Sequence, residues 1–204
     1  MASVAAILLA AGRSKRMGAF KPLLPFGNTT VIRSCIDNLR KANIEDIVVV
    51  VGHRAEAVRQ SLSDLKLKFA VNQDPDSEMS ASIACGVREL PSETQATLIA
   101  LTDQPAIPPE VIRDLVSEWE AGNRLVIPVF EGRGGHPALV GLRWREELLD
   151  LDPDRGLKAF FVAHSSEVRR VPVNSPFIAE DMDTWDDYRA LHREIFGGEP
   201  RPES

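Results

Sequence analysis

The segment Leu9–Lys21 reads L-A-A-G-R-S-K-R-M-G-A-F-K and directly follows the apolar run Val4–Leu8. The apolar run has the length of a buried strand, and the small residues with Gly12 let a ligand approach the backbone behind it. Backbone N–H groups after a strand can bind phosphate oxygens. Four cations follow that can neutralise them, namely Arg13, Lys15, Arg16 and Lys21. The segment therefore predicts a strand followed by a polyphosphate-binding loop.

The glycine spacing excludes two common phosphate loops. Walker A requires G-x-x-x-x-G-K-[ST], but Gly12 and Gly18 are too far apart and no Lys-Ser/Thr pair follows Gly18. The dinucleotide fingerprint G-x-G-x-x-G also fails, because no glycine stands two residues from Gly12. A surface loop with solvated cations is the alternative. Four cations and two glycines directly after a buried strand make that interpretation the weaker one.

Expected strands and helices alternate along the rest of the chain. The expected strands are Val4–Leu9, Ile47–Val51, Phe69–Val71, Thr97–Leu101, Leu125–Val129, Pro137–Val140 and Val168–Val173. The expected helices are Val31–Lys41, Ala55–Leu62, Met79–Leu90, one opening at Pro108 and Pro109, Trp144–Leu149, Gly156–Ala163, and one from Trp185 with a capping box of Thr184 and Asp187.

This alternation predicts an α/β fold class: a single Rossmann-like domain, residues 1–196, with a mainly parallel sheet covered by helices on both faces. Residues 197–204 form a polar tail that we expect to be disordered. Ligands of such sheets bind at the carboxyl ends of the strands. The loops after Leu9, after Leu101 and after the late strands should therefore line one cleft.

Composition narrows the class of protein. The chain has 204 residues, 44% of them hydrophobic and 26% charged, which fits one globular domain. Its net charge of −6 argues against a nucleic-acid partner, so the basic loop is a local feature suited to a small anionic ligand. Cys35 and Cys85 form no C-x-x-C pair and indicate buried thiols in a reducing cytosol. The first apolar run is too short for a membrane span, so we expect a cytoplasmic protein with no membrane partner.

Three aspartates are candidate metal ligands. Asp103 follows the strand Thr97–Leu101, and Asp181 and Asp183 precede the last helix. Mg²⁺ usually takes one or two protein carboxylates together with phosphates and waters. Asp103 could instead start a turn, and Asp181 or Asp183 could stabilise a helix N-terminus. Together with the first loop, the three residues favour the metal interpretation.

Leu9–Lys21 resembles the nucleotidyltransferase signature L-x-[AG]-G-x-x-x-R-[ML]-G-x-x-K. Further blocks at Thr102–Pro105 (T-D-Q-P), Gly135–Pro137 (G-H-P) and Asp181–Asp187 resemble those of the molybdenum-cofactor nucleotidyltransferase (MobA-like) family, in the same order. The resemblance extends to about Leu191 and implies the nucleotidyltransferase variant of the Rossmann-like fold.

Within that family, Ala11 resembles the cytidylyltransferase branch, because the guanylyltransferase branch typically has glycine there. Met79–Ser82 resembles that branch's segment near the cytosine and ribose. Trp185 is a departure, since the family usually has proline at this position. A helix start tolerates either residue.

The resemblance implies transfer of CMP from CTP to the phosphate of molybdenum-bound molybdopterin, with release of pyrophosphate and with Mg²⁺ or Mn²⁺ as cofactor. It implies Lys21, Arg16 and Asp103 as catalytic residues, and Asp103 and Asp183 as metal ligands with Asp181 as the alternative. The substrate-binding residues it implies are Leu9, Ala10, Ala11, Gly12, Arg13, Lys21, Ser80, Ser82 and His136.

The sequence leaves open several alternatives for the acceptor, the activity and the roles of two histidines. The acceptor could be a sugar phosphate or a guanylated molybdopterin, and a client molybdoenzyme could be a protein partner. The protein could instead be an NAD(P)H- and flavin-dependent oxidoreductase, or a chaperone that delivers the cofactor. His136 could face the pterin or simply pack beside a strand. For His53, at another strand end, a structural role is favoured over one at the cleft rim.

Overall fold

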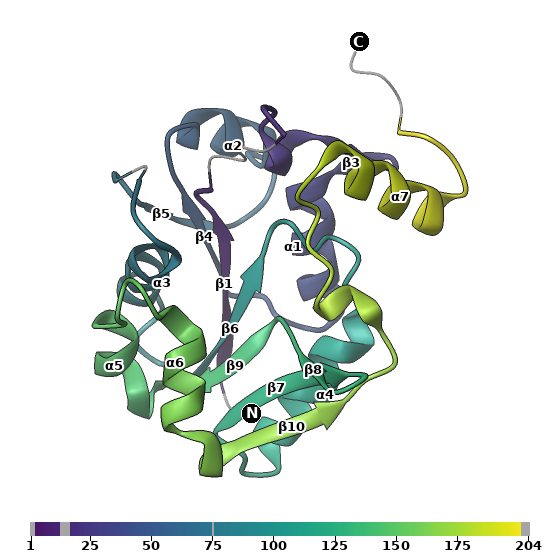
Figure 1. Cartoon of the computed structure of the whole chain (residues 1–204). Helices are drawn as coiled ribbons and strands as arrows, with labels where there is room; N and C mark the ends of the chain where they lie inside the picture. The colour runs from purple at the N-terminus through teal and green to yellow at the C-terminus, as the bar shows by residue number, and fades with distance from the viewer. Residues whose placement is uncertain (1–2, 13–16, 75, 201–204) are drawn as a thin grey trace.

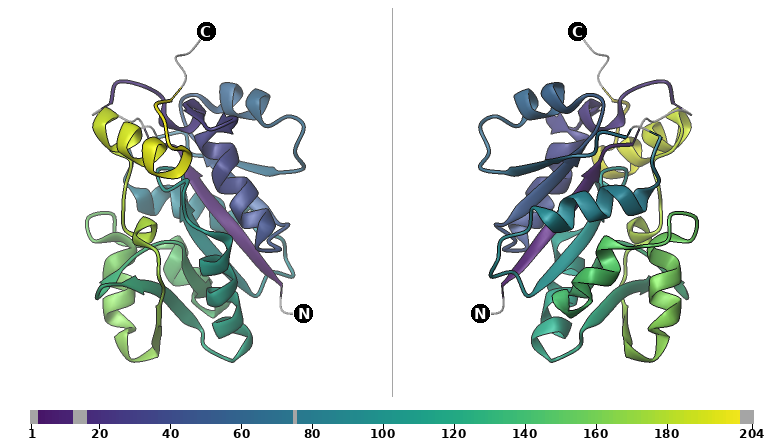
Figure 2. Two further views of the ribbon diagram at one scale, coloured as in Figure 1. Left: turned by 90° about the vertical axis from the view of Figure 1, so that its right-hand side faces the viewer. Right: turned by 90° about the vertical axis from the view of Figure 1, so that its left-hand side faces the viewer.

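The computed structural model describes residues 3–12, 17–74 and 76–200, and in them one central sheet lies between two layers of helices (Figures 1 and 2). The strand order is β10-β7-β9-β6-β1-β4-β5, and β8 pairs with β7. The expected α/β fold with a mainly parallel sheet is confirmed. The strands of this sheet are β1 (Val4–Ala10), β4 (Ile47–Val51), β5 (Lys68–Val71), β6 (Ala96–Leu101), β7 (Leu125–Phe130), β8 (Arg133–Gly134), β9 (Ala138–Gly141) and β10 (Val168–Pro172).

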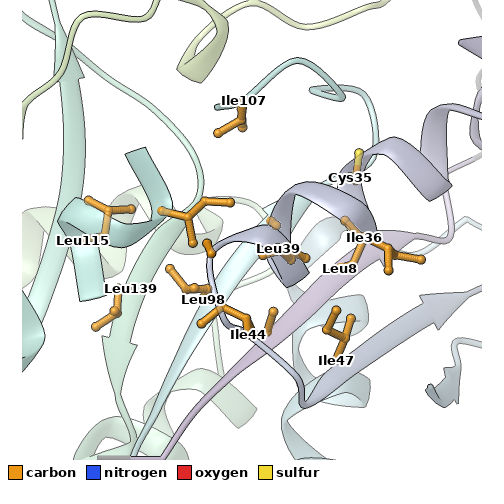
Figure 3. Close-up of a cluster of buried hydrophobic side chains, with 14 of the residues drawn as sticks. Leu8, Cys35, Ile36, Leu39, Ile44, Ile47, Leu98, Ile107, Leu115 and Leu139 are labelled. Carbon is orange, nitrogen blue, oxygen red and sulfur yellow. The ribbon is translucent and has the colours of Figure 1, made fainter. Parts of the chain in front are cut away.

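Alternation of side chains along β1 creates two cores, one on each face of the sheet. Ala6, Leu8 and Ala10 join the cluster under α1, α2 and α4, part of which Figure 3 shows. Ile7 and Leu9 join the cluster under α3, α5 and α6. The helices are α1 (Val31–Lys41), α2 (Ala55–Ser61), α3 (Met79–Arg88), α4 (Pro109–Glu120), α5 (Arg145–Leu149), α6 (Gly156–Ala163) and α7 (Trp185–Phe196).

The expected elements are confirmed, and Val31–Lys41, Ile47–Val51 and Gly156–Ala163 have the predicted bounds. The strand expected near Pro137–Val140 is β9, which runs antiparallel between β6 and β7. Three short strands had no sequence signal that we recognised. They are β8 and the separate hairpin of β2 (Pro25–Phe26) and β3 (Thr29–Thr30).

The carboxyl ends of β1 and β6 lie side by side because these parallel strands pair with Leu9 opposite Leu101. Thr102 reinforces this register at its first residue beyond β6. Its backbone N and its Oγ1 both donate to the Leu9 carbonyl oxygen, at 3.2 and 2.8 Å. On the other side of β1, β4 ends with Val51 opposite Ala10. The segments after β1 and β6 therefore start from adjacent points on one edge of the sheet.

A third, smaller core joins the two ends of the chain. It lies where α7 packs beside residues 17–24 and beside the β2–β3 hairpin (Figure 1). Its buried members are Met17, Leu24, Phe26, Val31, Met182 and Tyr188. The capping box expected at Thr184 and Asp187 is present at the start of α7.

The region expected to be a disordered tail begins with Gly197, which ends α7 in a left-handed conformation with φ of 72°. The Gly198 carbonyl then accepts a hydrogen bond from His192 Nδ1 at 2.7 Å. Residues 201–204 lie outside the described part of the chain. Among the described helices, none is both long and apolar enough to cross a bilayer.

Substitution Gly86→Ala should destabilise the fold. A Cβ at this position of α3 would lie 2.5 Å from Ile7 Cγ2 and 3.1 Å from Val50 Cγ2, both on buried strands. Overpacking of this kind typically costs about 1–3 kcal/mol, which offsets the roughly 1 kcal/mol gain in helix propensity. Gly198→Ala is the control, because a Cβ there meets nothing within 4 Å. Chemical denaturation measures both variants, and equal stabilities would contradict the packing argument.

Candidate active site

A cleft of about 490 Å³ opens at the carboxyl edge of the sheet, above β1 and β6. The segments after β1, β5 and β6, the start of α3 and the residues before α7 contribute its walls. Its lining residues are Leu9, Ala11, Gly12, Lys21, Pro22, Asn72, Asp74, Asp76, Ser77, Glu78, Met79, Ser82, Leu101, Thr102, Asp103 and Asp183. Residues from the first quarter, the middle and the end of the chain therefore meet in one cavity.

An ion pair between Lys21 and Asp183 crosses one side of this cleft. Lys21 Nζ lies 2.7 Å from Asp183 Oδ1, and the two side chains are 10% and 34% exposed. The backbone N–H of Asp183 is itself held by the Asp181 carbonyl and by Asp187 Oδ2, at 3.1 and 3.2 Å. The lysine is thus oriented by a carboxylate whose own backbone is fixed. A partly buried ammonium of this kind is suited to an anionic ligand.

Asp103 is a half-buried residue, and one of its carboxylate oxygens has unused hydrogen-bonding capacity. Its Oδ1 is buried and has no hydrogen-bond partner among the described residues. Burial, followed by repulsion from Asp181, raises the pKa of Asp103 to about 6, against the opposing attraction of Lys21. Burying an unpaired acceptor is unfavourable unless something satisfies it. A cation bound in the cleft would do so.

The donor set at this position fits a divalent cation that brings other ligands with it. Asp103 and Asp183 both line the cleft and offer hard carboxylate oxygens. Among the described residues, no group of three or more His, Cys, Asp or Glu side chains could hold a metal ion by itself. Mg²⁺ is commonly bound through one or two carboxylates plus substrate phosphates and waters. The cleft therefore fits a metal that enters with a phosphate ligand.

Asp181, the alternative ligand, has a different environment from Asp183. Its Oδ1 accepts a hydrogen bond from Gln104 Nε2 at 2.8 Å, and the same Nε2 lies 3.3 Å from the Ile178 carbonyl oxygen. Asp181 does not line the cleft. Asp183 therefore shares the cleft lining with Asp103, whereas Asp181, whose charge raises the pKa of Asp103 more than that of Asp183 does, joins the segment before α7 to the segment after β6.

Another part of the cleft lining is organised by Asn72, a residue for which the sequence motifs gave no indication. Asn72 follows β5 and is buried. Its Nδ2 donates to Ser77 Oγ and Ser82 Oγ at 2.8 and 2.9 Å, and its Oδ1 accepts from the Asp74 backbone N at 3.1 Å. Its position directly after a strand, like that of Asp103, was the signal that could have identified it. Ser82 lines the cleft, whereas Ser80 is buried outside its lining.

The remaining predicted residues divide between cleft and core. Leu9, Ala11 and Gly12 line the cleft, but Ala10 packs into the core under α1 because it points to the opposite face of β1. Gly52 backs this segment closely, since a Cβ there would lie 2.9 Å from the Ala11 carbonyl oxygen. Arg13, Lys15 and Arg16 lie outside the described residues.

His136 is held beside the sheet rather than in the lining of the cleft. Its backbone N donates to the Ile178 carbonyl at 2.8 Å, and its Nδ1 lies 3.2 Å from the Ile99 carbonyl. Burial lowers the pKa of the imidazole. Gly135 is required next to it, since a Cβ there would lie 2.0 Å from the Ile178 carbonyl oxygen. His53 is exposed, and its ring meets the edge of Phe20 at 5.7 Å between centroids.

Comparison with known proteins identifies the family. Residues 6–168 match the MobA-like NTP transferase domain. The chain is 28% identical to Rv0371c from Mycobacterium tuberculosis H37Rv, with a TM-score of 0.82 over 94% of this chain and 98% of that one. A structure of Rv0371c in complex with manganese also superposes, with a TM-score of 0.79 and 27% identity over 94% and 98% of the two chains.

The chain is also similar to two proteins whose names indicate different functions. The chain is 26% identical to nicotine blue oxidoreductase from Paenarthrobacter nicotinovorans over 92% of this chain and 96% of that protein. It is 34% identical to the bifunctional protein GlmU from Symbiobacterium thermophilum over 57% of this chain, and the match spans only 25% of GlmU. The protein belongs to the MobA-like NTP transferase domain family, as the sequence motifs predicted.

The buried charge of Asp103 should make the metal-free protein less stable as the pH rises. The pKa of this carboxyl is raised from 3.8 to about 6, so the folded state keeps its proton longer and loses this stabilisation as the pH passes through 6. Relative to Asp103→Asn, the wild-type protein should lose about 2 kcal/mol of stability between pH 4.5 and 7.5.

Denaturation of both proteins without metal, at several pH values, measures this difference. Adding Mg²⁺ with pyrophosphate at pH 7.5 should then stabilise the wild-type protein more than Asp103→Asn, because bound ligand stabilises the folded state. Parallel pH profiles, or equal stabilisation by the ligand, would contradict the assignment of Asp103.

Proposed function

We propose that the protein is a divalent-metal-dependent nucleotidyltransferase that transfers CMP from CTP to the terminal phosphate of molybdenum-bound molybdopterin. The observation that carries this proposal is the meeting of Lys21, Asp103 and Asp183 in one cleft, with Lys21 Nζ 2.7 Å from Asp183 Oδ1. The ammonium group of Lys21 and the two carboxylates lie in the same cleft as the small residues Ala11 and Gly12. This combination fits a nucleoside triphosphate with its metal ion.

The reaction needs alignment and charge neutralisation rather than a protein nucleophile. An oxygen of the acceptor phosphate attacks the α-phosphorus of CTP. The bond from that phosphorus to the bridging oxygen breaks, and pyrophosphate leaves with the electron pair. Lys21 neutralises negative charge on the leaving pyrophosphate, and Asp183 keeps its ammonium in place. Asp103 and Asp183 would hold Mg²⁺ or Mn²⁺, which would supply Lewis-acid stabilisation of the phosphate oxygens.

The choice of CTP rests on the part of the cleft formed by Ala11, Met79 and Ser82. All three residues line the cavity, and they belong to the segments that resemble the cytidylyltransferase branch. The methyl group of Ala11 reduces the space that a purine would need. Gly52 packs behind Ala11, so that this residue cannot move back from the cleft without a backbone shift.

The family resemblance supports the two remaining parts of the proposal, which are molybdopterin as the acceptor and the cytoplasm as the compartment. Molybdopterin carries a terminal phosphate, which is the nucleophile that the reaction requires. The manganese complex of Rv0371c supports a divalent cation in this kind of site. Cys35 and Cys85 are free thiols, which fits the reducing cytoplasm where we place the reaction.

An NAD(P)H-dependent oxidoreductase is the second candidate, because nicotine blue oxidoreductase matches along 92% of this chain. The two candidates make different demands on the cleft. Hydride transfer has no use for a carboxylate pair that holds a metal ion against a triphosphate. The Asp103 and Asp183 side chains therefore favour the transferase.

Pyrophosphate release across a panel of nucleotides and phosphorylated acceptors, with and without Mg²⁺, tests the proposal. Release with CTP and molybdopterin, dependent on Mg²⁺, is the expected result. Release with another acceptor would replace the acceptor assignment. NAD(P)H oxidation without pyrophosphate release would favour the oxidoreductase instead.

Asp183→Asn and Asp181→Asn form a matched pair that tests the choice of metal ligand. Asp183→Asn should lower kcat for pyrophosphate release by roughly 100-fold or more, because it removes a carboxylate from the metal and weakens the hold on Lys21. Asp181→Asn should keep most of the activity, because Asp181 lies outside the cleft lining and bonds to Gln104. The reverse pattern of activities would transfer the ligand role to Asp181.

Ala11→Gly should narrow the preference for CTP over GTP. Ala11 lines the cleft, and removal of its methyl group should open space for a larger base. One methyl group in a binding pocket is worth about 1–3 kcal/mol, so the ratio of kcat/KM values should change roughly 10- to 100-fold. Kinetics with each nucleotide measure the ratio. Equal use of both nucleotides by the wild-type protein would overturn the cytidylyltransferase assignment.

A further inference from the structure

Trp185 makes a contact that neither the motifs nor the proposed mechanism uses. It is the first residue of α7, and its Nε1 donates a hydrogen bond to the Met17 carbonyl oxygen at 3.0 Å. Met17 is buried and lies in the segment that joins β1 to Lys21. Trp185 is nevertheless 40% exposed, so it is not a core residue. Its specific polar contact is the hydrogen bond from Nε1 to the Met17 carbonyl oxygen.

A second aromatic residue on the same turn of α7 makes an equivalent contact beyond Lys21. Tyr188 lies against Trp185 with 5.7 Å between ring centroids, and its Oη donates to the Pro25 carbonyl at 2.6 Å. The two carbonyls, of Met17 and Pro25, lie on either side of Lys21 in the chain. Residues three apart on a helix share one face, so a single face of α7 holds both ends of this segment.

The same helix turn also fixes Asp183. Asp187 Oδ2 accepts hydrogen bonds from the backbone N–H groups of Asp183 and Thr184, at 3.2 and 2.7 Å. Asp183 precedes Trp185 by only two residues, with Thr184 as the N-cap between them. The carboxylate that pairs with Lys21 and the indole that holds Met17 therefore belong to one rigid turn. Trp185 thus links this turn to the backbone four residues before Lys21.

We propose that Trp185 is a positioning residue for the phosphate ligand: through the Met17 carbonyl it aligns the segment that carries Lys21 with Asp183. This inference rests on the proposed function only in taking the cleft as a site for a metal-bound polyphosphate. A neutral hydrogen bond contributes little to folding, whereas misplacing a ligand-binding group by about 1 Å can cost roughly 100-fold in rate. The role should therefore appear in ligand binding and turnover more than in stability.

Trp185→Phe tests the role, because it keeps an aromatic ring and removes the N–H donor. We expect the melting temperature to fall by only about 2–4 °C. The affinity for pyrophosphate with Mg²⁺, measured by calorimetry, should fall roughly tenfold or more, and kcat/KM for CTP roughly 10- to 100-fold. Amide hydrogen exchange should rise in peptides covering residues 17–20 and stay unchanged in β1 and β6.

Trp119→Phe is the matched control. Trp119 lies in α4, is buried, and its Nε1 has no hydrogen-bond partner among the described residues. This control should lower the melting temperature more than Trp185→Phe does, yet leave pyrophosphate affinity unchanged. Tyr188→Phe removes the second anchor and should weaken pyrophosphate binding in the same direction as Trp185→Phe.

The outcomes separate this inference from the proposed reaction. Unchanged pyrophosphate affinity or unchanged exchange at residues 17–20 in Trp185→Phe would overturn the positioning role. A wild-type protein that does not bind pyrophosphate with Mg²⁺ would overturn it as well. If the wild-type protein binds pyrophosphate but does not use CTP, the proposed transfer of CMP fails, and the binding and exchange results still decide the role of Trp185.

Discussion

The parallel pairing of β1 with β6 is the constraint on which the site depends. With Leu9 opposite Leu101, the small-residue segment and the Asp103 segment begin at neighbouring points of the sheet edge. The two hydrogen bonds from Thr102 to the Leu9 carbonyl oxygen stabilise this pairing register of β1 and β6. Because side chains alternate along a strand, a shift by one residue would exchange the two faces of β1 and bury the wrong set of side chains. Core packing therefore fixes the geometry of the cleft with the same residues that stabilise the fold.

The charged groups of the cleft suit it to a cation together with an anionic ligand. Asp103 is half-buried, its buried Oδ1 has no hydrogen-bond partner among the described residues, and its raised pKa reflects the free energy that burial of the carboxylate costs. Replacing it by an apolar residue would remove that cost and also remove the affinity for a cation. Lys21 is already paired with Asp183, so the lysine arrives in position but with its charge only partly available. A metal ion bound together with a polyphosphate would bring a cation to Asp103 and phosphate oxygens to Lys21.

The main helices and strands could be predicted from the sequence because their apolar patterns are clearly bounded, as for Ile47–Val51 and Val31–Lys41. It did not recover the direction of β9, since a strand buried on both faces has the same apolar pattern in either direction. Within the site, the sequence motifs correctly indicated that Lys21, Asp103 and Asp183 lie in one cleft. Ala10 and Ser80 point away from it, because adjacent residues of a strand or helix face different ways. Asn72 was missed because its hydrogen bonds to Ser77 and Ser82 join residues that no motif groups together.

The distance along the chain between Lys21 and Asp183 gives the site a further property. The two residues are 162 positions apart, and their ion pair forms only when α7 docks on the segment that follows β1. That docking buries Met17, Met182 and Tyr188 in a core separate from the two cores of the sheet. The contacts that place Asp183 beside Lys21 thus belong to a cluster distinct from the two that pack against the sheet. Stability of the fold and assembly of the site are therefore divided between different clusters, so that a substitution in α7 can impair the site while the sheet keeps its structure.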